Sequence, residues 1–134
     1  LDARALLIQG GGPAVPALAD PDPGSLQVDG WWGPATTAAL QAYLGTPVDG
    51  TVSSQDGAWR ENLPAAGAGW DFESDPDGSQ VVSALQARLG VPVDGILGPE
   101  TIAALQARLG VPVDGYVGMA TVAALQAHLN EGTL

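Results

Sequence analysis

The chain has 134 residues and no cysteine, and four Arg and no Lys face 15 acidic residues, for a formal net charge of −11. This length fills one ordinary domain or two very small ones, and the negative charge repels phosphate backbones and anionic lipids, so we expect no nucleic-acid or membrane partner. The missing cysteines exclude disulfides, thiolate nucleophiles and cysteine-based zinc sites.

The first part of the chain is predicted to be only partly regular. Because the chain begins at Leu1 rather than Met, we expect a piece of a longer protein. Residues 3–9 are a candidate first helix. Residues 10–24 are rich in Gly, Pro and Asp, which predicts a long surface loop.

The middle of the chain is predicted to alternate helix with irregular segments. Residues 34–44 are a clear helix, whereas the segment after Val48 carries Gly57 and ends at Pro64, so its helix is expected to be shorter. In the linker that follows, Trp70 and Phe72 alternate with polar residues, which predicts a short extended segment packed on a helical bundle.

The second half is predicted to contain three similar helices. Apolar residues recur at i, i+3 and i+7 in each, which is one stripe of a helical period and predicts a face turned to a core. Pro99 stands at a likely first helical position for Pro, and Gly90 and Gly110 stand where left-handed C-terminal caps belong. The three stripes are Val82, Leu85 and Leu89; Ile102, Leu105 and Leu109; and Val122, Leu125 and Leu129.

An internal duplication organises the whole chain. Val-Asp-Gly occurs four times, beginning at Val28, Val48, Val93 and Val113, so one constant shift maps the first pair onto the second. The segment 28–50 aligns with the segment 93–115 without a gap, and most of the aligned positions are identical. Each copy predicts one buried valine followed by a structural reversal between helices. The turn residues are Asp29, Gly30, Asp49, Gly50, Asp94, Gly95, Asp114 and Gly115.

These patterns predict an all-α fold of two tandem three-helix modules that pack against each other. The first, decorated module is assigned to residues 1–67, the linker to residues 68–78 and the second, regular module to residues 79–134. Modules of about 60 residues are marginal alone, which favours mutual burial.

The repeated motif resembles a known family. The order helix, D-G-x-x-G-P-x-T, helix, V-D-G-x-x-G-x-x-T, helix is similar to the three-helix peptidoglycan-binding domain of bacterial and phage cell-wall hydrolases. Residues 81–129 follow it at Asp94, Gly95, Gly98, Pro99, Thr101, Asp114, Gly115, Gly118 and Thr121. The first half follows it at Asp29, Gly30, Gly33, Pro34, Thr36, Asp49 and Gly50, but Ser53-Ser54-Gln55 replaces the last G-x-x-T.

The resemblance implies a non-catalytic module that binds peptidoglycan and anchors a covalently attached catalytic domain at the bacterial cell wall. The parent protein would be a phage endolysin or a secreted autolysin, and no cofactor is needed. The use of Ala and of Arg without Lys is typical of a GC-rich genome and suggests an actinobacterium or its phage. The alternative is a protein–protein interaction or self-assembly module that binds no carbohydrate.

Wall binding needs aromatic faces for sugars and fixed polar groups for hydroxyls and peptides. In each D-G-x-x-G turn the second x, Trp32, Leu97 or Val117, is predicted to plug the core, and the first x to point outward. Trp31, Ile96 and Tyr116 are therefore the candidate contacts, with Trp31 and Tyr116 preferred. Alternatively, they cover neighbouring helix ends. Trp59 and Trp70 are interpreted as packing residues.

Two further residue types recur in the repeats. Arg88 and Arg108 occupy equivalent positions and could hold a stem-peptide carboxylate, although solvated surface charge is the favoured interpretation. Gln106 recurs with its equivalents Gln41, Gln86 and Gln126 and could bind a ligand amide, although a bond to the preceding turn is favoured.

Catalysis and metal binding are disfavoured. The four turn Asp residues all precede Gly, so backbone capping explains them better than a pair of glycosidase acids. A calcium loop that starts at Glu73 has Gly78 at its sixth position but Ala84 where a Glu is required. His128 is the only histidine, so this chain alone cannot supply a zinc trio or a Ser-His-Asp relay.

Overall fold

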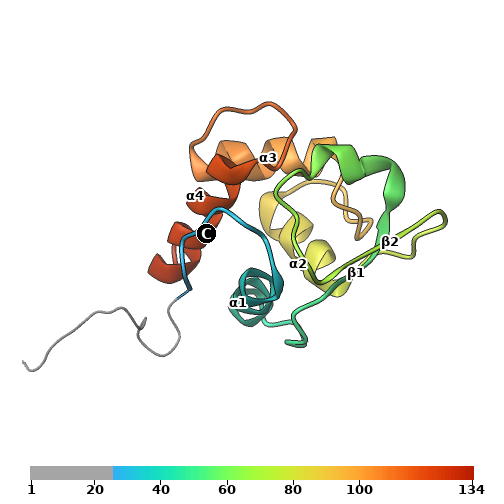
Figure 1. Cartoon of the computed structure of the whole chain (residues 1–134), viewed down its shortest axis with the longest axis horizontal. Helices are drawn as coiled ribbons and strands as arrows, with labels where there is room; N and C mark the ends of the chain where they lie inside the picture. The colour runs from blue at the N-terminus through green and yellow to red at the C-terminus, as the bar shows by residue number, and fades with distance from the viewer. Residues whose placement is uncertain (1–25) are drawn as a thin grey trace, which may run out of the picture.

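The computed structural model describes residues 26–134, which form α-helices together with a small sheet (Figure 1). The candidate helix at residues 3–9 and the loop at residues 10–24 lie outside these residues. The elements in chain order are α1 (Pro34–Leu44), β1 (Val52–Asp56), the 3₁₀ helix η1 (Gly57–Asn62), β2 (Trp70–Glu73), α2 (Gln80–Leu89), α3 (Pro99–Leu109) and α4 (Met119–Glu131).

The helix boundaries confirm the predicted start and stop signals. Pro34 and Pro99 occupy the first positions of α1 and α3, where the missing N–H costs nothing. Gly90 and Gly110 both end their helices at φ 77°, a left-handed conformation that glycine adopts without strain. The predicted helix at residues 34–44 is α1 itself.

The four α-helices form a closed ring. Within the described residues α1 packs on α2, α2 on α3, α3 on α4, and α4 back on α1. The C-terminal residue of the chain lies in the middle of this arrangement (Figure 1). Its side chain, Leu134, is only 1% exposed and belongs to the hydrophobic core.

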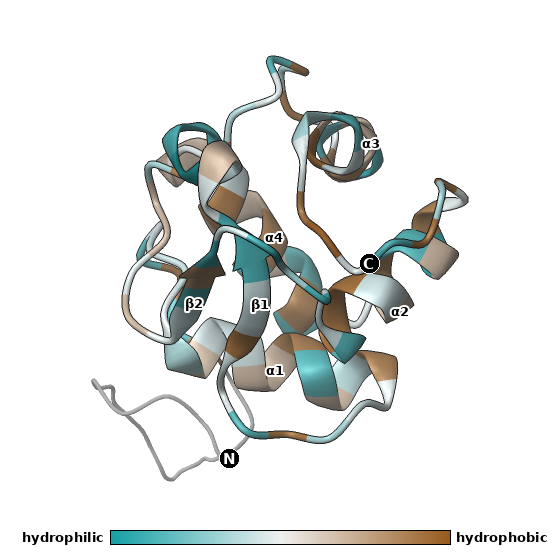
Figure 2. Ribbon diagram, turned by 90° about the vertical axis from the view of Figure 1, so that its right-hand side faces the viewer, coloured by the Kyte–Doolittle hydropathy of each residue, from teal (hydrophilic) through white to brown (hydrophobic). Residues whose placement is uncertain are grey.

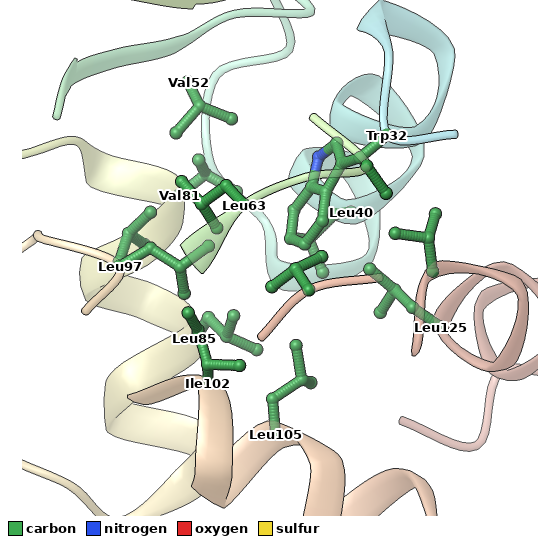
Figure 3. Packing of buried hydrophobic residues seen from close by; sticks show 14 of the residues in the cluster. Trp32, Leu40, Val52, Leu63, Val81, Leu85, Leu97, Ile102, Leu105 and Leu125 are labelled. Carbon is green, nitrogen blue, oxygen red and sulfur yellow. The ribbon is translucent and has the colours of Figure 1, made fainter. Parts of the chain in front are cut away.

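One hydrophobic cluster contains residues from both halves of the duplication (Figure 3). Leu40 of α1 and Leu125 of α4 belong to the same cluster as Leu85 of α2 and Leu105 of α3. In Figure 2 the apolar residues of the helices gather toward this interior. The predicted apolar stripes are confirmed, since their first two residues are buried in each helix and Leu89 and Leu129 pack on the cluster.

The predicted all-α fold class is wrong, because β1 and β2 form a two-stranded parallel sheet. In the described part of the first half, β1 and η1 stand where a further α-helix was expected. Val52 follows a β-branched Thr, and Ser53-Ser54-Gln55 brings no Gly-Pro helix start, so the local sequence suits an extended strand. The architecture is therefore not two three-helix modules.

The partner strand comes from the predicted linker. The extended segment expected around Trp70 and Phe72 is confirmed as β2, and Trp70 pairs with Val52 and Phe72 with Gln55. Trp70 also meets the ring of Trp32 edge-on, with 5.1 Å between centroids. A Cβ at Gly69 would lie 2.8 Å from the carbonyl oxygen of Gly50, so glycine is needed for this close approach.

The valine of each Val-Asp-Gly copy is exposed, which corrects the prediction that it is buried. The exposed fractions are 50% for Val28, 57% for Val48, 57% for Val93 and 56% for Val113. The core is plugged instead by the second residue after each Gly. These plugs are Trp32, Val52, Leu97 and Val117, and each is at most 1% exposed. The valine is exposed because a buried glutamine side chain binds the backbone N–H groups of the Asp and the Gly that follow it.

Candidate functional site

A buried glutamine holds each Asp-Gly turn. The side-chain oxygen of Gln106 accepts hydrogen bonds from the backbone N–H groups of Asp114 and Gly115, both at 3.0 Å. Its amide nitrogen donates to the Asp114 carboxylate at 2.7 Å, to the carbonyl of Tyr116 at 2.8 Å and to the hydroxyl of Thr121 at 3.1 Å. This network turns the Asp and Gly amides inward.

The same arrangement recurs at the other three turns. Gln86 holds the turn at Asp94 with the same five contacts, and Gln41 holds the turn at Asp49 with four of them, without the bond to a threonine hydroxyl. All four glutamines are at most 4% exposed. Gln106 was a candidate ligand contact, but its amide is buried and its hydrogen bonds go to the turn, so it is not open to a ligand.

The turn at Asp29 is held by a residue at the opposite end of the chain. Gln126 of α4 accepts from the N–H groups of Asp29 and Gly30 at 3.0 Å and donates to the hydroxyl of Thr36 at 2.9 Å. Beside it, Leu26 and Asn130 exchange two further hydrogen bonds. The first turn therefore binds α4 directly, and this contact closes the ring between α4 and α1.

Hydrogen bonds within the turns lower the pKa values of three turn carboxylates. The backbone N–H of Trp31, and after it the Gln126 amide, lower the pKa of Asp29. The Gln41 and Gln106 amides, followed by one backbone N–H each, lower the pKa values of Asp49 and Asp114. A carboxyl group with a lowered pKa is almost fully deprotonated at neutral pH, so it has no proton to donate to a substrate. The carboxylates instead accept the turn N–H groups and stabilise the turns.

A shallow groove lies beside the first turn, which we call the Trp31 groove. Its volume is about 240 Å³, and the Trp31 side chain, 50% exposed, forms part of its lining. Asp29, Pro34 and Thr36 also line it. An exposed indole face beside a carboxylate suits a ligand that offers both C–H surface and polar hydrogens, as a sugar does.

An equivalent groove of about 160 Å³ lies beside the turn at Asp94, and we call it the Trp59 groove. Within the aligned segments, six of its lining residues are the duplicated counterparts of residues that line the Trp31 groove. They are Asp94, Ile96, Gly98, Pro99, Glu100 and Thr101, which correspond in the duplication to Asp29, Trp31, Gly33, Pro34, Ala35 and Thr36. Trp59 joins this lining from η1 and is 37% exposed.

Trp59 is interpreted from the sequence as a packing residue, and its place in the lining of a groove was not predicted. In the structure a Cβ added at Gly98 would lie 3.2 Å from the indole nitrogen of Trp59, so this glycine leaves room for the ring. The segment that carries Trp59 has no counterpart among the repeated helices, and the contact joins residues far apart in the chain. No local pattern could therefore have placed this indole in a groove.

Tyr116 and Ile96 occupy the positions equivalent to Trp31 in two other turns. The Tyr116 side chain is 50% exposed, while Ile96 is half-buried in the lining of the Trp59 groove. The carbonyl of Gly115, next to Tyr116, accepts a hydrogen bond from Asn62 at 2.9 Å. The turn that carries Tyr116 is thereby tied to the end of η1.

Arg88 and Arg108 both bind the C-terminal residue of the same chain. Both donate to the carbonyl oxygen of Leu134, at 2.9 Å and 3.0 Å. Arg88 also donates to the hydroxyl of Tyr43 at 3.0 Å and stacks 4.9 Å above its ring. Neither arginine lines the Trp31 groove or the Trp59 groove. Their guanidinium groups thus help to hold the C-terminal segment in the ring.

The potential metal-ligating side chains of the described residues are dispersed. Across residues 26–134, no three His, Asp or Glu side chains come together as a metal site would require. No helix in that same range combines the length and apolar character needed to cross a bilayer.

Comparison with known proteins gives one match. The family model described as "Putative peptidoglycan binding domain" matches residues 71–105, which contain α2, the turn at Asp94 and the beginning of α3. No curated protein and no solved structure matches the chain. Residues 71–105 are therefore similar to that family, which is consistent with a peptidoglycan-binding domain and supports a peptidoglycan-binding role.

Proposed function

We propose that this chain is a non-catalytic anchor that holds an attached cell-wall hydrolase on peptidoglycan. The match of residues 71–105 to a peptidoglycan-binding family carries this proposal. A covalently attached catalytic domain would gain a high local concentration of its polymeric substrate from such an anchor. The parent protein would be a phage endolysin or a secreted autolysin, and the composition favours an actinobacterial origin.

In this proposal the Trp31 groove is a wall-binding site. The half-exposed indole offers an apolar face to a sugar ring, and the Asp29 carboxylate beside it accepts hydrogen bonds from hydroxyl or amide groups. Tyr116 is proposed as a second aromatic contact on its own turn, and Ile96 as an apolar one. Arg88 and Arg108 would contribute to wall binding indirectly, because they hold the C-terminal segment in place.

We also propose that residues 79–134 are the regular copy of the module and that residues 1–67 are a decorated copy, with residues 68–78 between them. The duplication that relates the Trp31 and Trp59 grooves supports two copies, and each groove also takes one lining residue from the other copy, Gln126 and Trp59 respectively. Tandem copies of a binding unit raise the residence time on a polymer.

Co-sedimentation with purified insoluble sacculi tests the function. The chain is expected to pellet with sacculi, and Trp31→Ala to lower the bound fraction at least about threefold, because an anchor aromatic contributes roughly 1 kcal/mol or more. Trp31→Phe, which keeps an aromatic face, is the matched control, and circular dichroism checks the fold of both.

Other outcomes would favour other functions. If the chain does not pellet above an unrelated acidic protein, the interaction or self-assembly alternative gains support. If the purified chain releases soluble muropeptides from sacculi, the non-catalytic anchor is wrong. A Trp31→Ala variant that pellets like the original chain would remove the Trp31 groove from the proposed binding surface.

A further inference from the structure

We propose that the Trp59 groove is a second ligand site, so that one chain holds two segments of wall polymer at the same time. The ligand class is the one proposed for the Trp31 groove, an amino-sugar ring with polar substituents, and the inference rests on that proposed function. Neither the repeat pattern nor the family match assigns a site to Trp59.

The two grooves share the same framework. In each, an Asp carboxylate, a Pro at the start of a helix and a Thr in the first turn of that helix form the lining. The Asp side chain accepts the backbone N–H of the first residue after Gly in both turns, at 3.0 Å for Trp31 and 2.9 Å for Ile96. A buried glutamine fixes each framework from behind, so both grooves are formed before a ligand arrives.

Each groove contains one partly exposed indole, although the two indoles come from different elements. In the Trp31 groove the aromatic residue is the first residue after Gly30. In the Trp59 groove that position is Ile96, and the indole comes instead from η1, above Gly98. Trp59 therefore supplies to the second groove the aromatic face that the turn at Asp94 lacks.

The grooves lie at different corners of the helix ring. The Trp31 groove lies where α4 meets α1, since Gln126 and Pro34 line it. The Trp59 groove lies at the start of α3, whose turn is held by Gln86 of α2. No residue lines both grooves, so both can be occupied together. On a continuous polymer this arrangement adds avidity, and between two strands it forms a bridge.

Titration followed by NMR tests the second site directly. The probe is the disaccharide-peptide monomer released from sacculi by a muramidase, and the readout is the four indole N–H signals of the chain. The signals of Trp31 and Trp59 are both expected to shift with saturation. Those of Trp32 and Trp70 are internal controls, because their indole N–H groups already donate within the protein to Thr37 and to the Trp32 carbonyl.

Single variants separate the two sites. In Trp59→Ala the Trp31 signal is expected to shift at an unchanged midpoint, and in Trp31→Ala the Trp59 signal is expected to do the same. Each single variant is expected to lose about tenfold or more in affinity for intact sacculi, because one of two linked contacts is gone. Trp59→Phe, which keeps an aromatic face, is expected to retain most of the binding.

The outcomes distinguish the second site from the proposed function. If only the Trp31 signal shifts and Trp59→Ala binds sacculi normally, the second site is overturned and the wall-binding function stands. If neither signal shifts and the chain does not bind sacculi, both are overturned. If the Trp59→Ala variant melts at a much lower temperature, the indole shifts of the unmodified chain decide the matter.

Discussion

The turn at Asp114 and the turn at Asp29 have the same hydrogen bonds but opposite positions in the chain. Gln106 holds Asp114, which follows it closely, whereas Gln126 holds Asp29, which lies almost at the other end of the described chain. Residues 127–134 contain no Val-Asp-Gly motif. The turn that Gln126 holds comes from a distant copy of the motif, and this contact joins α4 to the segment before α1.

The largest expected effect comes from the two plugs of these turns. Trp32→Ala is expected to lower the free energy of unfolding by about 3–5 kcal/mol, because it empties a large buried volume. Val117→Ala removes fewer atoms from an equally buried position and should cost less. Urea denaturation measures both, and equal losses would mean that the closing turn is packed no more tightly than the local one.

Variants of the two glutamines allow a more direct comparison of the two turns. Gln126→Ala and Gln106→Ala each leave two backbone N–H groups without their acceptor, and each is expected to cost about 1–3 kcal/mol. Amide hydrogen exchange should locate the damage at Asp29 and Gly30 in the first variant and at Asp114 and Gly115 in the second. Protection that is unchanged at Gly30 in Gln126→Ala would show that α4 does not hold the first turn.

The smallest effect concerns pH, because these carboxylates are exposed to solvent. The folded-state pKa values of Asp29 and Asp114 lie below the ordinary value. The charged carboxylates therefore stabilise the fold above the unfolded pKa of about 3.9, and this contribution is lost as the pH falls through the lower folded values.

Melting temperature measured between neutral pH and about pH 2 tests this expectation. Asp29→Asn and Asp114→Asn should each flatten part of the acid dependence, since an amide oxygen still accepts the turn N–H but does not titrate in this range. If both variants keep the full acid dependence, other carboxyl groups account for it.

Local patterns predicted much of the secondary structure. The helix at Pro34–Leu44, the apolar stripes and the caps at Gly90 and Gly110 follow from patterns within a few residues. The alternation around Trp70 predicted the extended segment but not its partner strand. The plug position in each turn was also visible, since Trp32 and Val117 are buried as expected. The prediction that the valines are buried was wrong. The Asp and Gly amides point inward because they donate to a glutamine side chain, and a hydropathy pattern does not reveal such a bond.

The sequence by itself determined the repeat, most of its helices and the buried second residue after the Gly of its turns, because each of these follows from spacing within one copy. The tertiary structure alone decided that α4 is completed by the first turn, that β1 pairs with β2 and that Trp59 lies over Gly98. These contacts join segments that are well separated in the chain. Which distant segments meet depends on how the whole chain buries its apolar surface, and no single repeat contains that information.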